Sequence, residues 1–158
     1  MKANLVVIAS MLTATLCMGA SAAWQYEDGE SPSLTLRAES GRNQFGKAPV
    51  LKIRCNNKAA MLSIDWLTFV NDGPRQVVDR IDDRPAVAVN WPVSKDYEES
   101  LRPGSAAVVR QLLRASRYSA RLDPYSQAPI SARFDVRGLD AAARQYAITC
   151  VEKGDGAR

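Results

Sequence analysis

Hydrophobic and polar side chains alternate with a period of two through most of the chain between residues 33 and 136. This alternation is typical of half-buried strands. Turn-forming sequences separate the alternating runs, the strongest being Asn-Asp-Gly-Pro at 71–74. Short turns between successive strands favour antiparallel pairing. The pattern therefore predicts strands over residues 33–39, 50–55, 62–66, 75–81, 86–91, 118–122 and 130–136.

The period changes to that of a helix in the last third of the chain. Apolar residues recur at helical spacing over residues 105–117, and Ser105 is placed to cap that helix. A second, alanine-rich helix is expected from Ala141 to about Cys150, with Asp140 as its cap. Residues 24–33 and 92–104 are expected to be irregular, because they contain Pro and Gly without a clear period.

These elements predict a single domain over residues 24–158 of class α+β, mainly β. The expected architecture is an antiparallel, sandwich-like sheet core with two helices in the C-terminal third. Strands 50–55 and 62–66 should form a hairpin that carries Cys55 on its core side.

Residues 1–23 have the three parts of a cleaved secretory signal peptide. Lys2 supplies the positive start, residues 5–18 are an uncharged apolar run, and residues 20–23 are small. The run is shorter than the about 18 to 20 apolar residues that a membrane span needs. A lipoprotein would need a small residue before Cys17, where Leu16 stands. We therefore expect cleavage after residue 22 or 23 and export to the periplasm.

Export changes the interpretation of the cysteines. Cys17 leaves with the signal peptide, and Cys55 and Cys150 remain. An even pair in an oxidising compartment predicts a disulfide. The alternative, a redox couple, has no support from the spacing, since the two thiols lie far apart in the sequence and form no Cys-x-x-Cys motif.

Composition limits the chemistry that the chain can perform. It has 21 Lys and Arg, 17 Asp and Glu, and no His, so neither a Ser-His-Asp or Cys-His nucleophile pair nor a His-ligated zinc site can form. Asp79, Asp82 and Asp83 are candidates for the paired carboxylates of a glycosidase. Arg80 and Arg84 alongside them favour ionised carboxylates, and Asp82 and Asp83 also suit a turn. We therefore predict no enzyme activity, no cofactor and no metal.

Positive charge gathers in the C-terminal part of the chain. Arg110, Arg114 and Arg117 fall at i, i+4 and i+7, so they would share one face of the helix predicted over 105–117. One interpretation is contact with an anionic surface, and the other is a solvated helix face. Nucleic acid is not an expected partner, because the chain is exported and has no aromatic-interleaved basic motif.

An ordered set of motifs resembles the VasI/TagO family of type VI secretion-associated exported proteins. The set consists of Leu-x-Ile-x-Cys at 51–55, Arg-Ile-Asp-Asp-Arg-Pro at 80–85, Trp-Pro-Val-Ser-Lys-Asp at 91–96, Leu-Leu at 112–113, Asp-Pro-Tyr at 123–125, Ala-Arg-Phe-Asp-Val-Arg-Gly-Leu at 132–139, and Cys150. The resemblance covers roughly residues 50–150. It implies an accessory envelope component without established catalytic residues.

Three functions follow as hypotheses. The first is a periplasmic accessory protein of a type VI secretion system that contacts an envelope or secretion-apparatus protein. The second is a periplasmic inhibitor or immunity-type module against an envelope-degrading enzyme. The third, least favoured, is a carboxylate-based peptidoglycan hydrolase. The predicted binding surface consists of Arg80, Asp82, Trp91, Ser94, Asp96, Arg110, Arg114, Arg117 and Tyr125.

Overall fold

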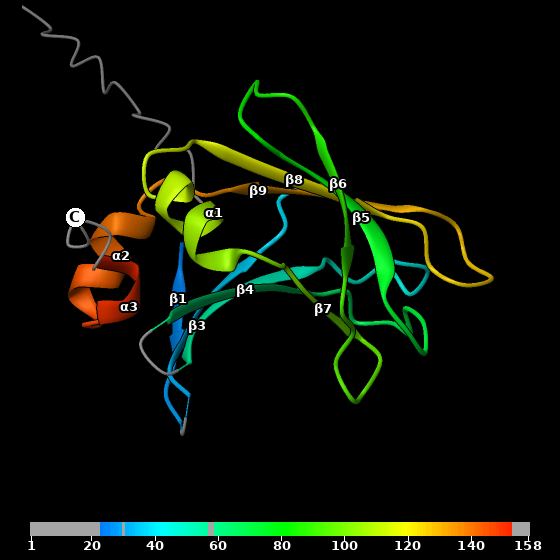
Figure 1. Cartoon of the computed structure of the whole chain (residues 1–158), viewed down its shortest axis with the longest axis horizontal. Helices are drawn as coiled ribbons and strands as arrows, with labels where there is room; N and C mark the ends of the chain where they lie inside the picture. The colour runs from blue at the N-terminus through cyan, green and yellow to red at the C-terminus, as the bar shows by residue number, and fades with distance from the viewer. Residues whose placement is uncertain (1–22, 30, 57–58, 153–158) are drawn as a thin grey trace, which may run out of the picture.

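The described residues fold into two antiparallel sheets with short helices at one end. The structure is a computed structural model that describes residues 23–29, 31–56 and 59–152. The five-stranded sheet has the order β1-β2-β3-β4-β7 and the four-stranded sheet the order β6-β5-β8-β9 (Figure 1). This confirms the prediction of a mainly β, α+β fold. The predicted signal peptide, all but residue 23, lies outside the described residues.

The strands and helices have the following bounds. The five-stranded sheet consists of β1 (Gln25–Glu27), β2 (Ser33–Arg37), β3 (Val50–Asn56), β4 (Ala59–Asp65) and β7 (Glu99–Leu101). The four-stranded sheet consists of β5 (Arg75–Ile81), β6 (Val87–Trp91), β8 (Arg117–Leu122) and β9 (Ile130–Asp135). The helices are α1 (Ser105–Leu112), α2 (Leu139–Gln145) and α3 (Thr149–Glu152).

The core lies between the two sheets and follows from the alternation in the sequence. In β3 and β4, the inward side chains are fully buried and belong to Leu51, Ile53, Leu62 and Ile64. The four-stranded sheet contributes inward residues such as Val77, Tyr118, Leu122, Ile130 and Phe134. Burying each such side chain stabilises the fold by about 1.5 to 3 kcal/mol. The same alternation points every second side chain of each strand outward, which is where the candidate sites arise.

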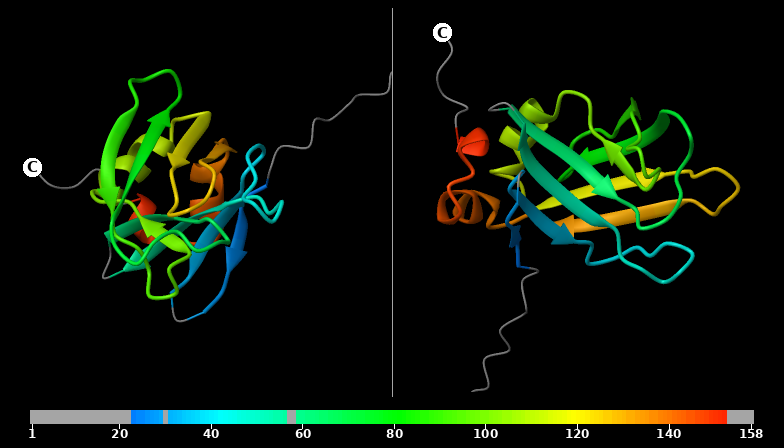
Figure 2. Two further views of the ribbon diagram at one scale, coloured as in Figure 1. Left: turned by 90° about the vertical axis from the view of Figure 1, so that its right-hand side faces the viewer. Right: turned by 90° about the horizontal axis from the view of Figure 1, so that it is seen from below.

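The helices close one end of the sandwich. Helix α1 packs on β4 through Val108, Val109 and Leu112, and α3 contacts β3, β4 and α1 (Figures 1 and 2). The predicted disulfide is confirmed: Cys55 of β3 is bonded to Cys150 of α3, with Cα atoms 5.7 Å apart. It joins segments 95 residues apart in the sequence. The opposite end of the sandwich consists of loops.

The first helix is shorter than predicted. It ends at Leu112 instead of residue 117, and Ser105 is its first residue, while Gly104 in the left-handed region (φ 68°) takes the cap position. The chain leaves the helix because the carboxylate of Asp82 accepts the backbone N–H groups of Ser116 and Arg117, at 3.0 and 2.8 Å. These bonds draw the chain into β8.

The second helix is divided in two. Helix α2 begins at Leu139, so Asp140 lies in its first turn and pairs with Arg144 at 2.8 Å instead of capping. The helical path stops at Ala147, whose φ of 52° is left-handed. This break directs Ile148 into the core and starts α3 as a separate turn that carries Cys150.

Two short strands were not predicted. Strand β1 lies within the segment expected to be irregular, and it pairs with β2 while Tyr26 stacks on Tyr146 with ring centroids 4.6 Å apart. Strand β7 lies within residues 92–104 and pairs with β4. Both strands have three residues, which is too few for a period to be visible in the sequence.

Candidate functional site

The predicted arginine stripe is wrong as a helix face. Arg110 lies on α1, Arg114 lies in the turn after it, and Arg117 is the first residue of β8. These three side chains therefore belong to three different structural elements. The helix that was expected to align them ends before Arg114 for the reason given above.

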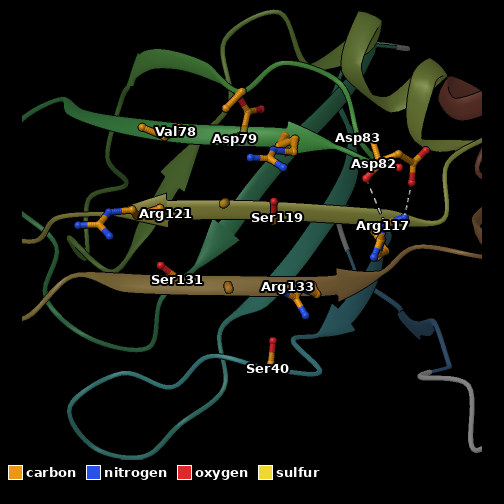
Figure 3. A pocket seen from close by; sticks show the side chains of 14 residues that line it. Ser40, Val78, Asp79, Asp82, Asp83, Arg117, Ser119, Arg121, Ser131 and Arg133 are labelled. Carbon is orange, nitrogen blue, oxygen red and sulfur yellow. Dashed lines mark hydrogen bonds and ion pairs between the residues drawn. The ribbon is translucent and has the colours of Figure 1, made fainter.

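Arginines gather instead on the outer face of the four-stranded sheet. There, Arg and Ser alternate: Arg117, Ser119 and Arg121 point outward from β8, and Ser131 and Arg133 point outward from β9 (Figure 3). The register pairs Ser119 with Arg133 and Arg121 with Ser131, so that these two arginines each have a hydroxyl across from them, while Arg117 lies opposite Asp135. Arg80 of β5 pairs with Ser119 from the other side.

These side chains line a hollow of about 420 Å³, which we call the arginine hollow. Its floor consists of β5, β8 and β9. The turn at 82–86 stands along one side, and Ser40 lies along the other, beyond β9 (Figure 3). Ser40 pairs with Arg133 in an isolated β-bridge, which extends the sheet by one residue.

Gly41 permits this close approach. Its φ is +94°, and a Cβ atom at this position would lie 1.9 Å from the carbonyl oxygen of Ser131. No side chain fits at that distance, so the chain can follow the edge of β9 only with glycine here.

The four arginines of the hollow differ in their partners. Arg117 pairs with Asp83 at 3.3 Å and Arg121 pairs with Asp123 at 3.1 Å. Arg80 and Arg133, which flank Ser119, have no carboxylate within ion-pair distance among the described residues. The carboxylate of Asp82, at the rim, accepts hydrogen bonds from the backbone N–H groups of Ser116 and Arg117, where β8 begins. The centre of the hollow is therefore positively charged.

A second candidate site lies on the loops at the end of the sandwich far from α2 and α3 (Figures 1 and 2). Four aromatic side chains are exposed there, one from each of four loops: Phe45, Phe69, Tyr97 and Tyr125. The rings of Phe69 and Tyr97 are 5.9 Å apart, and the backbone N–H of Tyr125 donates to the carbonyl of Val70 at 3.0 Å. We call this surface the aromatic loop end.

A cleft of about 460 Å³ opens between these loops. Phe45, Leu67, Phe69, Lys47 and Glu98 line it. Its apolar walls thus carry one charge of each sign.

Two side chains fix the loops relative to one another. Asn43 is 6% exposed, donates through Nδ2 to the carbonyls of Trp66 (2.9 Å) and Leu67 (2.8 Å), and accepts at Oδ1 from two backbone N–H groups of its own loop. Gln127 donates through Nε2 to the carbonyl of Phe69 at 2.8 Å and accepts from the hydroxyl of Thr68 at 3.2 Å.

Ser94 and Asp96, both predicted as binding residues, shape the loop that presents Tyr97. The Ser94 hydroxyl donates to Asp96 and accepts from the backbone N–H of Glu99 at 3.0 Å. The hydrogen bond from Ser94 lowers the pKa of the Asp96 carboxyl, which stays charged at neutral pH. Tyr97 itself has a left-handed φ of 63°, and such strain persists only where neighbouring contacts enforce it.

The predicted binding residue Trp91 is completely buried, so its side chain cannot contribute to a surface. It is the last residue of β6, and its side chain belongs to the core of the sandwich. Arg102 lies over its ring at 5.9 Å and pairs with buried Asp79 at 2.8 Å. The Tyr118 hydroxyl also donates to Asp79, at 2.8 Å.

This buried cluster separates the three carboxylates proposed for hydrolysis. Asp79 points into the sandwich, while Asp82 and Asp83 belong to the turn outside it. All three residues line the arginine hollow, but the Asp79 carboxylate is held by Arg102 and Tyr118 and that of Asp82 by backbone N–H groups, so these two are not arranged as the free acid and base that a glycosidase needs.

The site contains residues that sequence reasoning missed. Ser119, Ser131 and Arg133 were assigned to strands, and the alternation alone places them outward, yet nothing in the pattern shows that β8, β9 and β5 are neighbours. Phe45, Phe69 and Tyr97 lie in loops, which have no period to interpret. The predicted residues that do reach these two sites are Arg80, Asp82, Ser94, Asp96, Arg117 and Tyr125.

No group of side chains suited to hold a metal ion occurs in the described part of the chain. Among the same residues, no helix has the length and apolarity needed to cross a membrane.

The fold resembles that of a known bacterial protein. No family model and no curated protein matches the chain. Among solved structures, the chain is similar to invasion associated protein B from Bartonella henselae, with a TM-score of 0.58 and 10% sequence identity, over 87% of this chain and 97% of that one. This similarity shows a shared fold. The resemblance to the VasI/TagO family is not confirmed and stays a prediction.

Proposed function

We propose that the protein is an exported, non-catalytic binding protein that docks a partner protein of the cell envelope through the aromatic loop end. The observation that carries the proposal is the gathering of four exposed aromatic side chains from four loops at one end of the sandwich, where Phe45 and Phe69 line one cleft. Aromatic residues are enriched at the energetically important centres of protein interfaces. Of the large apolar side chains exposed among the described residues, all but Val87 lie at this end.

The charges around the aromatic side chains favour a protein partner over a lipid surface. Lys47 and Glu98 both line the cleft, and Lys95 and Asp96 flank the loop of Tyr97. An anionic bilayer attracts basic residues and repels carboxylates. An apolar centre with a rim of mixed charge is instead the usual anatomy of a protein interface.

The rigidity of the loops also supports docking. Binding costs about 0.5 to 1.5 kcal/mol for each side chain that must be ordered. Asn43 and Gln127 already hold the loops together by hydrogen bonds, so a partner meets a surface that needs little ordering.

Export and the absence of catalysis belong to the same proposal. The disulfide Cys55–Cys150 suits an oxidising compartment, which agrees with the signal peptide predicted over residues 1–23. The chain has no His, and its clustered carboxylates are divided between the core and the surface. The resemblance described from the sequence motifs adds that the partner belongs to a type VI secretion apparatus.

The test is co-purification from a periplasmic extract, compared across three versions of the tagged mature chain. The wild type should retain one envelope protein at a fixed stoichiometry. Phe45→Ala/Phe69→Ala should lose it. Val87→Ala, which truncates an exposed apolar residue of β6 away from the loops, should retain it. A partner that binds all three versions equally, or none at all, contradicts the proposal.

The identity of the partner then separates the finer hypotheses. A secretion-apparatus protein, together with loss of secretion on gene deletion, supports the type VI accessory role. An envelope-degrading enzyme whose activity falls at one equivalent of this protein supports the inhibitor role, which rigid protruding loops also suit. Clearing of purified peptidoglycan by the protein alone, abolished by Asp82→Asn, contradicts the non-catalytic part of the proposal.

A further inference from the structure

The cationic side chains on the outer faces of the two sheets differ in their ion pairing. On the five-stranded sheet, Lys52 pairs with Asp65 at 2.8 Å and with Glu99 at 3.5 Å, and Arg54 also pairs with Glu99. These two cations of β3 are neutralised by carboxylates of β4 and β7, while Arg37, at the end of β2, has no ion pair among the described residues. Such pairing is the usual arrangement, because opposite charges across strands stabilise a sheet.

The four-stranded sheet lacks this neutralisation at its centre. Arg80 and Arg133 lie on either side of Ser119 and have no carboxylate partner in the described part of the chain. The carboxylate of Asp82 is close by at the rim, but it is held by backbone N–H groups. Two guanidinium groups without ion pairs are therefore carried by the strands on either side of Ser119.

Hydroxyl groups complete the set of donors. The Ser119 and Ser131 hydroxyls stand across from arginines in the register, and Ser40 lies beside Arg133 at the far edge. Guanidinium groups bind phosphate through two parallel hydrogen bonds, and a serine hydroxyl can donate a third. Together these groups match the several acceptor oxygens of a tetrahedral oxyanion.

The shape of the hollow restricts what can enter. The turn at 82–86 and the segment at Ser40 stand on opposite sides of the floor (Figure 3). Ser119 is partly buried and shorter than the exposed arginines around it, so a flat bilayer would meet those arginines before it could reach Ser119. A discrete phosphate group on a soluble or flexible ligand can do so.

We propose that the arginine hollow is a binding site for a phosphate group of a soluble ligand, held by Arg80, Arg133 and Ser119. The site is separate from the aromatic loop end, so the proposal does not depend on the protein-docking function.

The experiment uses the mature, disulfide-bonded chain with inorganic pyrophosphate as the probe at low ionic strength. Amide resonances of residues 117–121 and 131–133 should shift on titration, while those of the five-stranded sheet should not. Arg80→Gln/Arg133→Gln should weaken binding at least about tenfold, since two charge-assisted contacts are lost. Arg110→Gln/Arg114→Gln removes the same charge from exposed residues elsewhere and should change the affinity less than about twofold.

A conservative variant separates geometry from charge. Arg80→Lys/Arg133→Lys keeps both charges but loses the planar fork, so it should bind pyrophosphate with an affinity between those of the wild type and the Gln variant. Circular dichroism must show the fold of each variant unchanged. No resonance shift in the wild type, or equal losses in the two Gln pairs, overturns the proposal. Binding to phosphatidylglycerol vesicles without binding to pyrophosphate also overturns it, because the phosphate group that the hollow binds would then belong to a lipid bilayer and not to a soluble ligand.

Discussion

Asn43 is the side chain whose removal most directly tests the rigidity of the aromatic loop end. It is buried, and it makes four hydrogen bonds of 2.8 to 3.0 Å. Two of them tie the loop after β2 to the carbonyls of Trp66 and Leu67, and the other two close its own loop on the N–H groups of Phe45 and Lys47. Asn43→Ala breaks all four at once.

The expected cost follows from these contacts. A typical intramolecular hydrogen bond contributes about 0.5 to 1.5 kcal/mol net, so four give roughly 2 to 6 kcal/mol. Water that enters the loop end after truncation will satisfy part of the backbone, which offsets some of the loss. We expect the free energy of unfolding to fall by about 3 kcal/mol, with weaker partner binding because the loops are no longer held in place.

Urea denaturation followed by Trp fluorescence measures this loss. Asn71→Ala is the matched control, since Asn71 lies on the loop between β4 and β5 and donates a single bond of 3.2 Å to the carbonyl of Gly73. The control should cost less than about 1 kcal/mol. If Asn43→Ala is as stable as Asn71→Ala to within that margin, the four hydrogen bonds do not hold the loop end together and the argument for its rigidity is refuted.

Three further predictions concern the core, the disulfide and the edge of the hollow. Burial, together with the neighbouring Asp79 carboxylate, raises the pKa of the Tyr118 hydroxyl well above its usual value. The unfolded chain therefore releases this proton at a lower pH than the folded chain, and the free energy of unfolding should fall as pH rises above about 10. In urea titrations at alkaline pH, Tyr118→Phe should lack this part of the pH dependence. Reduction of Cys55–Cys150, which are 95 residues apart, should lower the free energy of unfolding by about 4 to 5 kcal/mol, and a Cys55→Ala/Cys150→Ala variant insensitive to reductant is the control. Gly41→Ala should lower the free energy of unfolding by roughly 2 to 3 kcal/mol in thermal melts, because the new Cβ collides with the backbone of β9. Gly46→Ala is the control, since Gly46 has a φ of +74° but open space around it, and it should lower the free energy by only about 1 kcal/mol. Equal losses in the two variants would contradict the collision.

The strands could be predicted because their pattern is local. In β5 and β9, inward and outward positions alternate without a break, and both were placed to within one residue. The end of α1 could not be predicted in this way. It depends on the carboxylate of Asp82 binding the chain at Arg117, a contact across 35 residues that no window of sequence contains.

The candidate sites show the same division. The outward orientation of Arg80 and Arg117 follows from the period of their strands, but their proximity follows from the order β6-β5-β8-β9, which places β5, from the middle of the chain, directly beside β8. Trp91 was assigned to the binding surface because its Trp-x-x-Ser-x-Asp segment resembles one of the VasI/TagO family, whereas its position at the end of β6 buries its side chain completely.

The segment between β2 and β3 links the two proposed sites. Ser40 and Gly41 follow the edge of β9 at the arginine hollow, and Asn43 and Phe45 stand two to four residues further along at the aromatic loop end. Since the two sites share this segment but no binding side chain, substitutions should separate them. Phe45→Ala/Phe69→Ala should leave pyrophosphate affinity unchanged, and the glutamine variants of the hollow should leave co-purification of the protein partner unchanged. Loss of both in the glutamine variant would mean that the protein partner itself supplies the anionic group, and that the two surfaces form one interface around residues 40–45.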